Sequence, residues 1–457
     1  MNDDFCARKT NRFIDNFKGS AKCFLYFQYG TFIIAIYSIN DYNSWFFTNI
    51  TLLYHACRCG KADEDDWQNF LSLFALHLQQ LLSNLMKFIV SSSTLLKQLQ
   101  QISGVINSNT VLPILEDFLF LIEKNELTVV ATDLETVMKV KLEVEAKETG
   151  RICIPAKILL DSLKNLPDQP LTFNIDLNSF AVEITSDNGK YKVMGENPEN
   201  FPKEPAAEDA TNFTMTASAL ITAINKTLFA VSNDDLRPQM TGVFFELHPD
   251  NITFVATDAH RLVKYIRTDV KCPQADTFIV PKKPLNLLKA AIPDNDSEIR
   301  VSYSGNHFFV SHDNAQMICR LIDARFPDYK VVIPKENPYR LTLVKNDFQN
   351  GLKRVSVFAN KSTNQVALNI SGSELQLSAQ DVDFSFEGNE RMSCQYSGED
   401  MQIAFNAKFL IEMLNAAEGD EITIDLSAPT KAGILRPVEK GAEEDLLMLV
   451  MPLLLNN

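Results

Sequence analysis

"LTVVATDLETVMKVKL", residues 127–142, alternates apolar and polar side chains on both sides of an acidic turn, which is the pattern of a β-hairpin. The same pattern returns as "ITFVATDAHRLVKYI" at 252–266 and more faintly as "LQLSAQDVDFSFEG" at 375–388. The turn aspartates recur at intervals of about 125 residues, which indicates repeated domains rather than a solenoid of short repeats. These aspartates are Asp133, Asp258 and Asp381.

Each repeat also contains two helical stretches, which are recognised by apolar residues at helical spacing. One stretch precedes the hairpin and the other follows it, and alternating strands complete the repeat. Two helices beside a majority of antiparallel strands predict an α+β fold in which both helices pack on one face of a sheet. The helices predicted before the hairpins are 92–106, 216–232 and 344–360. After the hairpins, the stretches 153–167, 279–293 and 403–419 each read as a strand followed by a short amphipathic helix.

Two stretches rich in proline and charge, 195–210 and 326–340, show neither a helix nor a strand pattern and are predicted to be links. With these links as boundaries, the sequence predicts three domains of similar length. The predicted domains are 86–205, 206–335 and 336–457, and residues 1–85 form an atypical extension.

The extension differs from the rest of the chain because it is crowded with Phe, Tyr and Asn. Its apolar stretch 23–39 is interrupted by Gln28 and Gly30 and is a little short for the roughly 20 residues that cross a membrane. From Met86 onward the sequence begins like a chain start, with a short strand and a capped helix. We therefore expect Met86 to be the natural start, and we expect no membrane association.

The net charge of −15, taken alone, argues against a nucleic-acid partner. The six predicted helices, however, carry eleven basic residues and few acidic ones, so the positive charge is concentrated on one kind of element. If the helices share one side of the assembly, that side suits contact with phosphate groups regardless of base sequence. The alternative is that these lysines only solvate exposed helix faces.

Few residues are placed for catalysis. In the second hairpin Asp258 and His260 stand two apart, so on a strand they would share a face, as in many acid–base sites. The chain nevertheless has no nucleophile elbow and no Gly-rich phosphate loop. Cys57 and Cys59 lack a second pair at metal-ligand spacing. We expect no metal and no cofactor, and reduced thiols in a cytoplasmic protein; a hydrolase using Asp258 and His260 remains an alternative.

Five short motifs occur in the order typical of one bacterial protein family: "VLPIL" at 111–115, "ATDLE" at 131–135, "ATDAHRL" at 256–262, "RFPDY" at 325–329 and "VMPL" at 450–453. Through them, the chain from Met86 to Leu455 resembles the bacterial DNA polymerase III β subunits, the sliding clamps. The resemblance leaves out residues 1–85.

The resemblance implies a non-enzymatic processivity factor of DNA replication and repair. Two subunits of three domains each would join head to tail into a homodimeric ring, with helices lining the hole and sheets outside. The implied partners are duplex DNA bound without sequence preference, the clamp loader, the DNA polymerase III α subunit, other DNA polymerases and mismatch-repair proteins. A repeat-built adaptor that binds peptides without encircling DNA remains the second alternative.

The resemblance also implies a pocket between the middle and last domains for a short partner peptide, whose backbone His260, Arg261 and Asn406 would help to place. Ala259 stands where glycine is common and Val331 where arginine often stands, so the pocket should be more apolar than usual. The matching positions are Met240, Thr257, Ala259, His260, Arg261, Leu262, Pro327, Val331, Val332, Asn406, Phe409, Thr430, Ala432, Leu449, Met451, Pro452 and Leu453.

Two further surfaces are implied by the resemblance, a DNA channel and a joint between subunits. The loop 233–239 keeps Arg237 for the channel, but it lacks aromatic residues and adds acids, which puts its contact with DNA in doubt. The implied joint residues are Tyr191 and Val193 of the first domain against Val357 and Phe358 of the third, and the channel residues are Lys97, Lys157, Lys164, Lys226, Arg237, Lys282, Lys283, Lys289, Lys353, Arg354 and Lys408.

Overall fold

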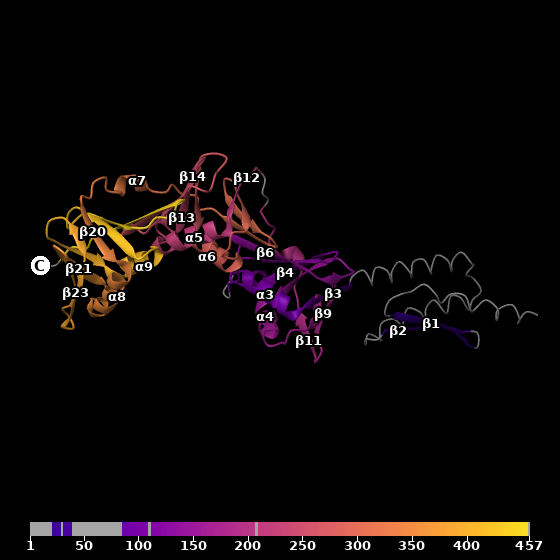
Figure 1. Cartoon of the computed structure of the whole chain (residues 1–457). Helices are drawn as coiled ribbons and strands as arrows, with labels where there is room; N and C mark the ends of the chain where they lie inside the picture. Colours follow the sequence, from indigo (N-terminus) through magenta and orange to yellow (C-terminus); the bar gives the residue numbers. More distant parts are fainter. Residues whose placement is uncertain (1–20, 29–30, 39–84, 108–110, 206–208, 456–457) are drawn as a thin grey trace, which may run out of the picture. The chain divides into compact units, whose positions relative to one another are not determined.

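The structure is a computed structural model that describes residues 21–28, 31–38, 85–107, 111–205 and 209–455 (Figure 1). The chain divides into two compact units, residues 1–82 and 83–457. In the first unit β1 (Ala21–Gln28) and β2 (Thr31–Ser38) pair as an antiparallel hairpin, which accounts for most of the apolar stretch 23–39. In the described part of the chain, no helix is long and apolar enough to cross a membrane.

The second unit contains three repeats with one order of elements. Repeat 1 comprises β3 (Leu85–Ser91), α3 (Ser92–Ser103), β4 (Asp117–Glu123), β5 (Glu126–Thr132), β6 (Thr136–Glu143), β7 (Glu145–Ala146), β8 (Gly150–Pro155), α4 (Ala156–Lys164), β9 (Pro170–Asp176), β10 (Ala181–Thr185) and β11 (Lys190–Met194). Repeat 2 comprises β12 (Thr211–Thr216), α5 (Ala217–Thr227), β13 (Gly242–His248), β14 (Asn251–Thr257), β15 (Arg261–Arg267), β16 (Asp276–Pro281), α6 (Lys282–Ala291), β17 (Glu298–Tyr303), β18 (His307–His312) and β19 (Ala315–Arg320). Repeat 3 comprises β20 (Tyr339–Val344), α8 (Lys345–Val355), β21 (Gln365–Ser371), β22 (Glu374–Asp381), β23 (Phe386–Ser393), β24 (Gln395–Ser397), β25 (Met401–Asn406), α9 (Ala407–Ala416), β26 (Glu421–Leu426), β27 (Gly433–Pro437) and β28 (Glu444–Val450).

The predicted helices form for local reasons. In α3 the Ser91 side chain caps the helix by accepting from the backbone N–H of Thr94, and Leu95, Leu99 and Ile102 lie buried along one face. Two of the helices predicted before the hairpins end earlier than expected. A 3-10 turn follows α5 (Leu228–Ala230), and another follows α8 (Ser356–Phe358).

The strands of each repeat divide between two sheets, which differs from the expected single sheet with helices on one face. Helix α3, for example, contacts β3 in one sheet and β6 in another. The helices therefore pack against strands of both sheets through their buried faces, and one apolar cluster extends through all three repeats. The link 326–340 also differs from the prediction, because it contains the one-turn helix α7 (Tyr329–Val332), which the side chain of Asp328 caps.

Neighbouring repeats share sheets. An eight-stranded sheet, β12-β17-β18-β19-β6-β5-β4-β8, joins repeats 1 and 2 through the antiparallel pair β6 and β19. A nine-stranded sheet, β16-β13-β14-β15-β28-β27-β26-β20-β24, joins repeats 2 and 3 through β15 and β28. At both junctions, the strand that follows the hairpin turn of one repeat thus pairs with the last strand of the next repeat. The corresponding strands at the two ends, β23 in repeat 3 and β11 in repeat 1, are edge strands in the described structure.

Candidate functional site

The acidic residues of the first two hairpins are turn residues. Asp258 Oδ1 accepts hydrogen bonds from the backbone N–H groups of His260 and Arg261, both at 2.9 Å. Asp133 Oδ1 accepts in the same way from Glu135 and Thr136, at 3.2 and 2.7 Å. These bonds satisfy backbone N–H groups that a tight turn leaves without a backbone acceptor, so the aspartates have a structural role. Among the described residues, no group of three or more His, Cys, Asp and Glu side chains could hold a metal ion.

Arg261 is an internal connector between repeats 2 and 3. Its side chain is only 8% exposed, and its Nε donates to Asp258 Oδ2 at 3.1 Å. Its Nη1 donates to Glu412 of α9, and its Nη2 donates to the carbonyl oxygen of Phe229 at 2.6 Å. The guanidinium also lies 4.4 Å from the ring centroid of Phe409. Since its charge is already paired, Arg261 holds α9 against the second hairpin.

The pairing of β15 with β28 brings most of the expected pocket residues together. Leu262 lies opposite Leu449, and both belong to an apolar cluster with Ala432 and Phe326. After β28 the chain end is fixed to both repeats, because the Met451 N–H donates to His260 O and the Leu453 N–H donates to Ala404 O, each at 2.8 Å. The remaining positions surround this seam: Thr257 and Ala259 in the hairpin, Pro327, Val331 and Val332 on and before α7, Asn406 and Phe409 at the start of α9, and Pro452 in the tail.

Several of these pocket residues have a structural role in addition to any contact with a partner. The Thr257 hydroxyl donates to Arg261 O at 2.7 Å inside the turn, and Asn406 caps α9 by accepting from the N–H of Lys408. Met240 and Thr430 lie in the turns before β13 and β27. Exposed apolar side chains remain at Val331, Val332 and Met451.

Sequence reasoning missed Glu246, which anchors the segment around α7. Its carboxylate accepts from Tyr329 Oη at 2.5 Å and from Lys330 Nζ at 2.6 Å. Burial alone would raise the pKa of Glu246, but these two hydrogen bonds outweigh it and leave the pKa below its usual value. No motif marked this residue, because its partners come from more than 80 residues further along the chain.

The helices present lysines as expected from the charge distribution. Five of the six carry an exposed lysine with no acidic oxygen within 4 Å among the described residues, namely Lys97, Lys157, Lys289, Lys353 and Lys408. The other expected channel residues have partners in the chain: Lys164 with Asp161, Arg237 with Asp234, Lys282 with Asn233, Lys283 with Asp133 and Arg354 with Glu390.

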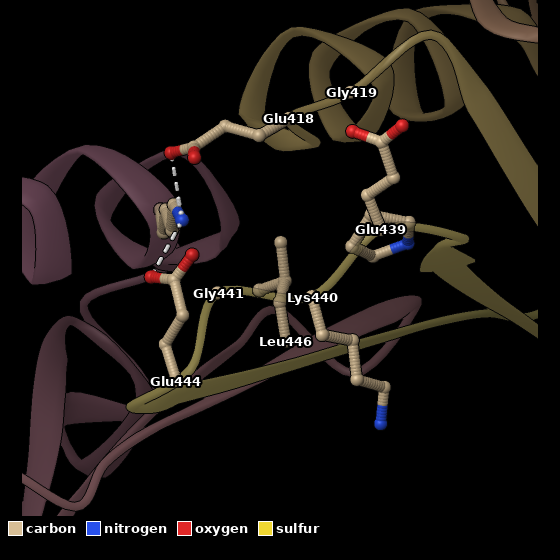
Figure 2. Close-up of a pocket in the computed structure, with 9 residues that line it drawn as sticks. Glu418, Gly419, Glu439, Lys440, Gly441, Glu444 and Leu446 are labelled. Carbon is tan, nitrogen blue, oxygen red and sulfur yellow. Dashed lines mark hydrogen bonds and ion pairs between the residues drawn. The ribbon is translucent and has the colours of Figure 1, made fainter.

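Lys226 corrects the expectation that all these lysines face DNA. Its side chain is 5% exposed and its Nζ lies 2.8 Å from Glu418 and 3.0 Å from Glu444. These residues line a pocket of about 270 Å³ between α5 and the turn before β28, where Figure 2 shows the two carboxylates. Tyr265 Oη also donates to Glu444. The buried ammonium therefore joins repeats 2 and 3 and cannot meet a phosphate.

The expected joint residues lie at the two edge strands. Tyr191 and Val193 are on β11, and their cross-strand partners Ile184 and Val182 are buried, so the four side chains share the helix-covered face. Phe358, in the 3-10 turn after α8, packs against Gly388 of β23, where an added Cβ would lie 2.6 Å from its ring. Each edge thus carries exposed apolar side chains.

Comparisons with known proteins agree with this architecture. Models of the DNA polymerase III beta subunit match in succession, the N-terminal domain at residues 86–205, the central domain at 214–328 and the C-terminal domain at 330–453. A beta sliding clamp of Chlamydia pneumoniae is 29% identical over 374 residues, covering 81% of this chain and 100% of that protein. The beta sliding clamp of Escherichia coli K12 is 26% identical over 369 residues, with 80% and 100% covered.

Solved structures show the same likeness. The DNA polymerase III beta subunit of Thermotoga maritima is 27% identical, with a TM-score of 0.75 over 81% of this chain and 100% of that one. A sliding clamp of Bartonella birtlesii, solved bound to griselimycin, is 25% identical with a TM-score of 0.76 and the same coverage.

Proposed function

Because this chain belongs to the DNA polymerase III beta subunit family, whose members are non-catalytic sliding clamps that serve as processivity factors, we propose that two copies close into a ring around duplex DNA. The observation that carries this proposal is the repeated sharing of sheets. The junction of β6 with β19 recurs as that of β15 with β28, and the same junction is left open at β23 and β11. A head-to-tail contact of this kind gives a closed ring when its rotation closes.

Duplex DNA would meet the exposed lysines of the helices. Lysine side chains attract phosphates without fixing a register, so a ring lined by them can slide along DNA of any sequence. We expect Lys97, Lys157, Lys289, Lys353 and Lys408 to supply this attraction, because their ammonium groups have no acidic partner among the described residues. Lys226 is excluded from the channel by its burial.

A partner peptide would dock at the seam of β15 and β28, over the apolar cluster and beside the exposed side chains of Val331, Val332 and Met451. Apolar pockets with a few fixed polar groups recognise short linear motifs by burying Leu, Met or Phe side chains. We propose that the DNA polymerase III α subunit, the clamp loader, other DNA polymerases and mismatch-repair proteins use this site in the cytoplasm.

The ring is tested by its topological hold on DNA. The chain, loaded onto nicked circular DNA by a clamp loader, should stay bound in high salt and should be released when the DNA is cut once. A peptide-binding adaptor that does not encircle DNA would show no difference between circular and linear DNA. Light scattering after size exclusion should give a dimer at micromolar concentration, and a monomer there would refute the ring.

The pocket and the channel are separated by two variants. Deleting residues 451–455 removes apolar side chains worth roughly 1.5 to 3 kcal/mol each, so the affinity for a polymerase-tail peptide should fall by at least about tenfold. The double variant Lys157→Glu/Lys289→Glu should weaken DNA association and flatten its salt dependence, since fewer counterions are released.

The matched control for charge is Lys147→Glu/Lys271→Glu, which changes the net charge equally at exposed residues outside the helices. It should leave DNA retention near the parent value. A tail deletion that keeps full peptide affinity would contradict the pocket, and equal DNA loss in both lysine pairs would contradict the channel.

A further inference from the structure

The third hairpin differs from the first two at its tip. Two residues separate Asp133 from Thr136 and Asp258 from Arg261, whereas four separate Asp381 from Phe386, its partner in the β22–β23 pair. The longer turn carries Val382 and Phe384, and the side chains of Phe384 and Phe386 are 67% and 52% exposed. Their rings stack on each other with centroids 5.8 Å apart. An edge strand has unpaired backbone groups to which another strand can add, and exposed aromatic rings at its end mark a surface for interaction.

The two junctions inside the chain show what such a tip contacts. At the junction of repeats 1 and 2, the first turn of α6 contacts the preceding hairpin through Lys283 and Asp133. At the junction of repeats 2 and 3, the first turn of α9 contacts the preceding hairpin through Phe409 and Arg261. The corresponding helix of repeat 1 is α4, since it follows β8 as α6 follows β16 and α9 follows β25.

The first turn of α4 has an apolar side chain free for this contact. Aligned on their first buried leucines, "PAKIL" (155–159) and "NAKFL" (406–410) place Ile158 at the position of Phe409. Ile158 is 50% exposed on a helix whose other apolar residues are largely covered. Among the three repeats of the described structure, none precedes repeat 1, so no repeat hairpin takes the place that the hairpins of repeats 1 and 2 take at α6 and α9.

The internal junctions also fix a register for the open one. In both, the first residue of the strand after the turn pairs with the last core-facing residue of the final strand, Thr136 with Cys319 and Arg261 with Val450. The equivalent pair across two chains is Phe386 with Val193. Two residues further, Gly388 falls opposite Tyr191.

In this register, the large side chain of Tyr191 lies opposite a glycine. Gly388 has no side chain, and Phe358 already packs on it. The ring of Tyr191 from the other chain would therefore lie beside Phe358 on the helix-covered face. Along the same edges, Lys190 and Lys192 of β11 are already ion-paired with Glu183, so the acidic Asp383 and Glu387 of the facing strand and turn add little charge attraction.

We propose that a second copy of this chain covers the tip: Phe386 pairs with Val193, and Phe384 and Phe386 enclose Ile158 in an aromatic clasp that locks the ring joint. This proposal rests on the ring proposed above and adds its register and its apolar character. Where the internal contacts are an ion pair at Lys283 and a cation–π contact at Arg261, the clasp is apolar. Salt screens exposed charges but does not weaken apolar contacts.

Cysteine pairs test the register on the full chain. Residues directly opposite in an antiparallel pair have Cβ atoms about 4.5 to 5.5 Å apart, and a small approach of the two strands brings them to the roughly 4 Å that a disulfide needs. Phe386→Cys with Val193→Cys should give a covalent dimer under mild oxidation, and each single variant should not. The matched control, Phe386→Cys with Lys192→Cys, places the second thiol on the opposite face and should stay monomeric on a denaturing gel. A control pair that cross-links as well as the designed pair would overturn the register.

Subunit affinity tests the clasp. Sedimentation of Phe384→Ser/Phe386→Ser should show a dimer dissociation constant at least about a hundredfold above that of the parent, because each buried aromatic anchor is worth a decade or more. Val438→Ser removes an exposed apolar side chain of the same repeat away from the edge and should leave the constant unchanged. The conservative Phe386→Leu should keep most of the affinity, and equal melting temperatures exclude misfolding.

The outcomes separate the clasp from the ring. If the parent dimerises and its dimer dissociation constant changes less than about threefold between 0.1 and 1 M salt, the clasp is supported. If the parent dimerises and Phe384→Ser/Phe386→Ser dimerises with equal affinity, the clasp is overturned. The ring then stays intact, and the tip is free for another protein. A parent that stays monomeric at micromolar concentration removes the ring and the clasp together.

Discussion

Replacing Arg261 by methionine should loosen the junction between repeats 2 and 3. Methionine keeps much of the side-chain volume but loses the bonds to Asp258, Glu412 and the carbonyl of Phe229, as well as the contact with the Phe409 ring. Removing one member of a buried, paired charge network destabilises a protein by about 3 to 5 kcal/mol. Glu412 is nearly half exposed and regains water, so we expect a value near the lower end, about 3 kcal/mol.

The measurement is thermal unfolding of the full chain by calorimetry. At about 2 to 4 °C per kcal/mol for a structure of this size, the transition that includes repeats 2 and 3 should fall by roughly 6 to 12 °C. Hydrogen exchange of the β28 amides should accelerate in parallel, because β28 pairs with β15.

Two controls accompany the variant. Arg320→Met removes an arginine of the same size whose contact with Glu135 is long and exposed, so it should change stability by less than about 1 kcal/mol. Arg261→Lys keeps the charge but not the three-way bonding and should fall between the parent and methionine. A shift below about 2 °C for Arg261→Met would refute the inference that this arginine holds the junction together.

Three further predictions concern single residues. Ala259 has a φ of 74°, so Ala259→Gly should raise stability by about 0.5 to 1 kcal/mol in chemical unfolding, and a loss would show that the turn is unstrained. Burial, followed by the charges of Glu196 and Glu116, raises the pKa of Asp117 from 3.8 to about 7. The parent should therefore lose stability as the pH rises from about 4 through 7, because the folded state must then give up a proton that it holds more tightly than the unfolded state does. The stability of Asp117→Asn should be constant in that window, and above it the variant should be more stable than the parent by about 1 to 3 kcal/mol. Lys226→Met should lower the stability by about 3 kcal/mol while leaving DNA retention of the folded protein unchanged; a loss of DNA binding without a loss of stability would return this lysine to the channel.

Much of the fold could be read from the sequence because its signals are local. Alternating side chains around Asp133 and Asp258 mark hairpins whose turn bonds lie within three residues, and helical spacing marks the two long helices of each described repeat. Repetition of these signals at a constant interval also predicted three similar units. The family was identified from motifs that stand in order, each of which belongs to one such local element.

The tertiary structure decided what each charged residue does. Lys226 and Lys157 both read as basic residues on amphipathic helices, yet Lys226 is buried because Glu444 approaches from 218 residues away, while Lys157 stays exposed. Arg261 was expected to face a partner peptide, but Glu412, 151 residues further on, holds it inside a junction. Local pattern determines which face of an element is polar, whereas only the packing of distant elements determines whether a charge on that face meets water or an opposite charge.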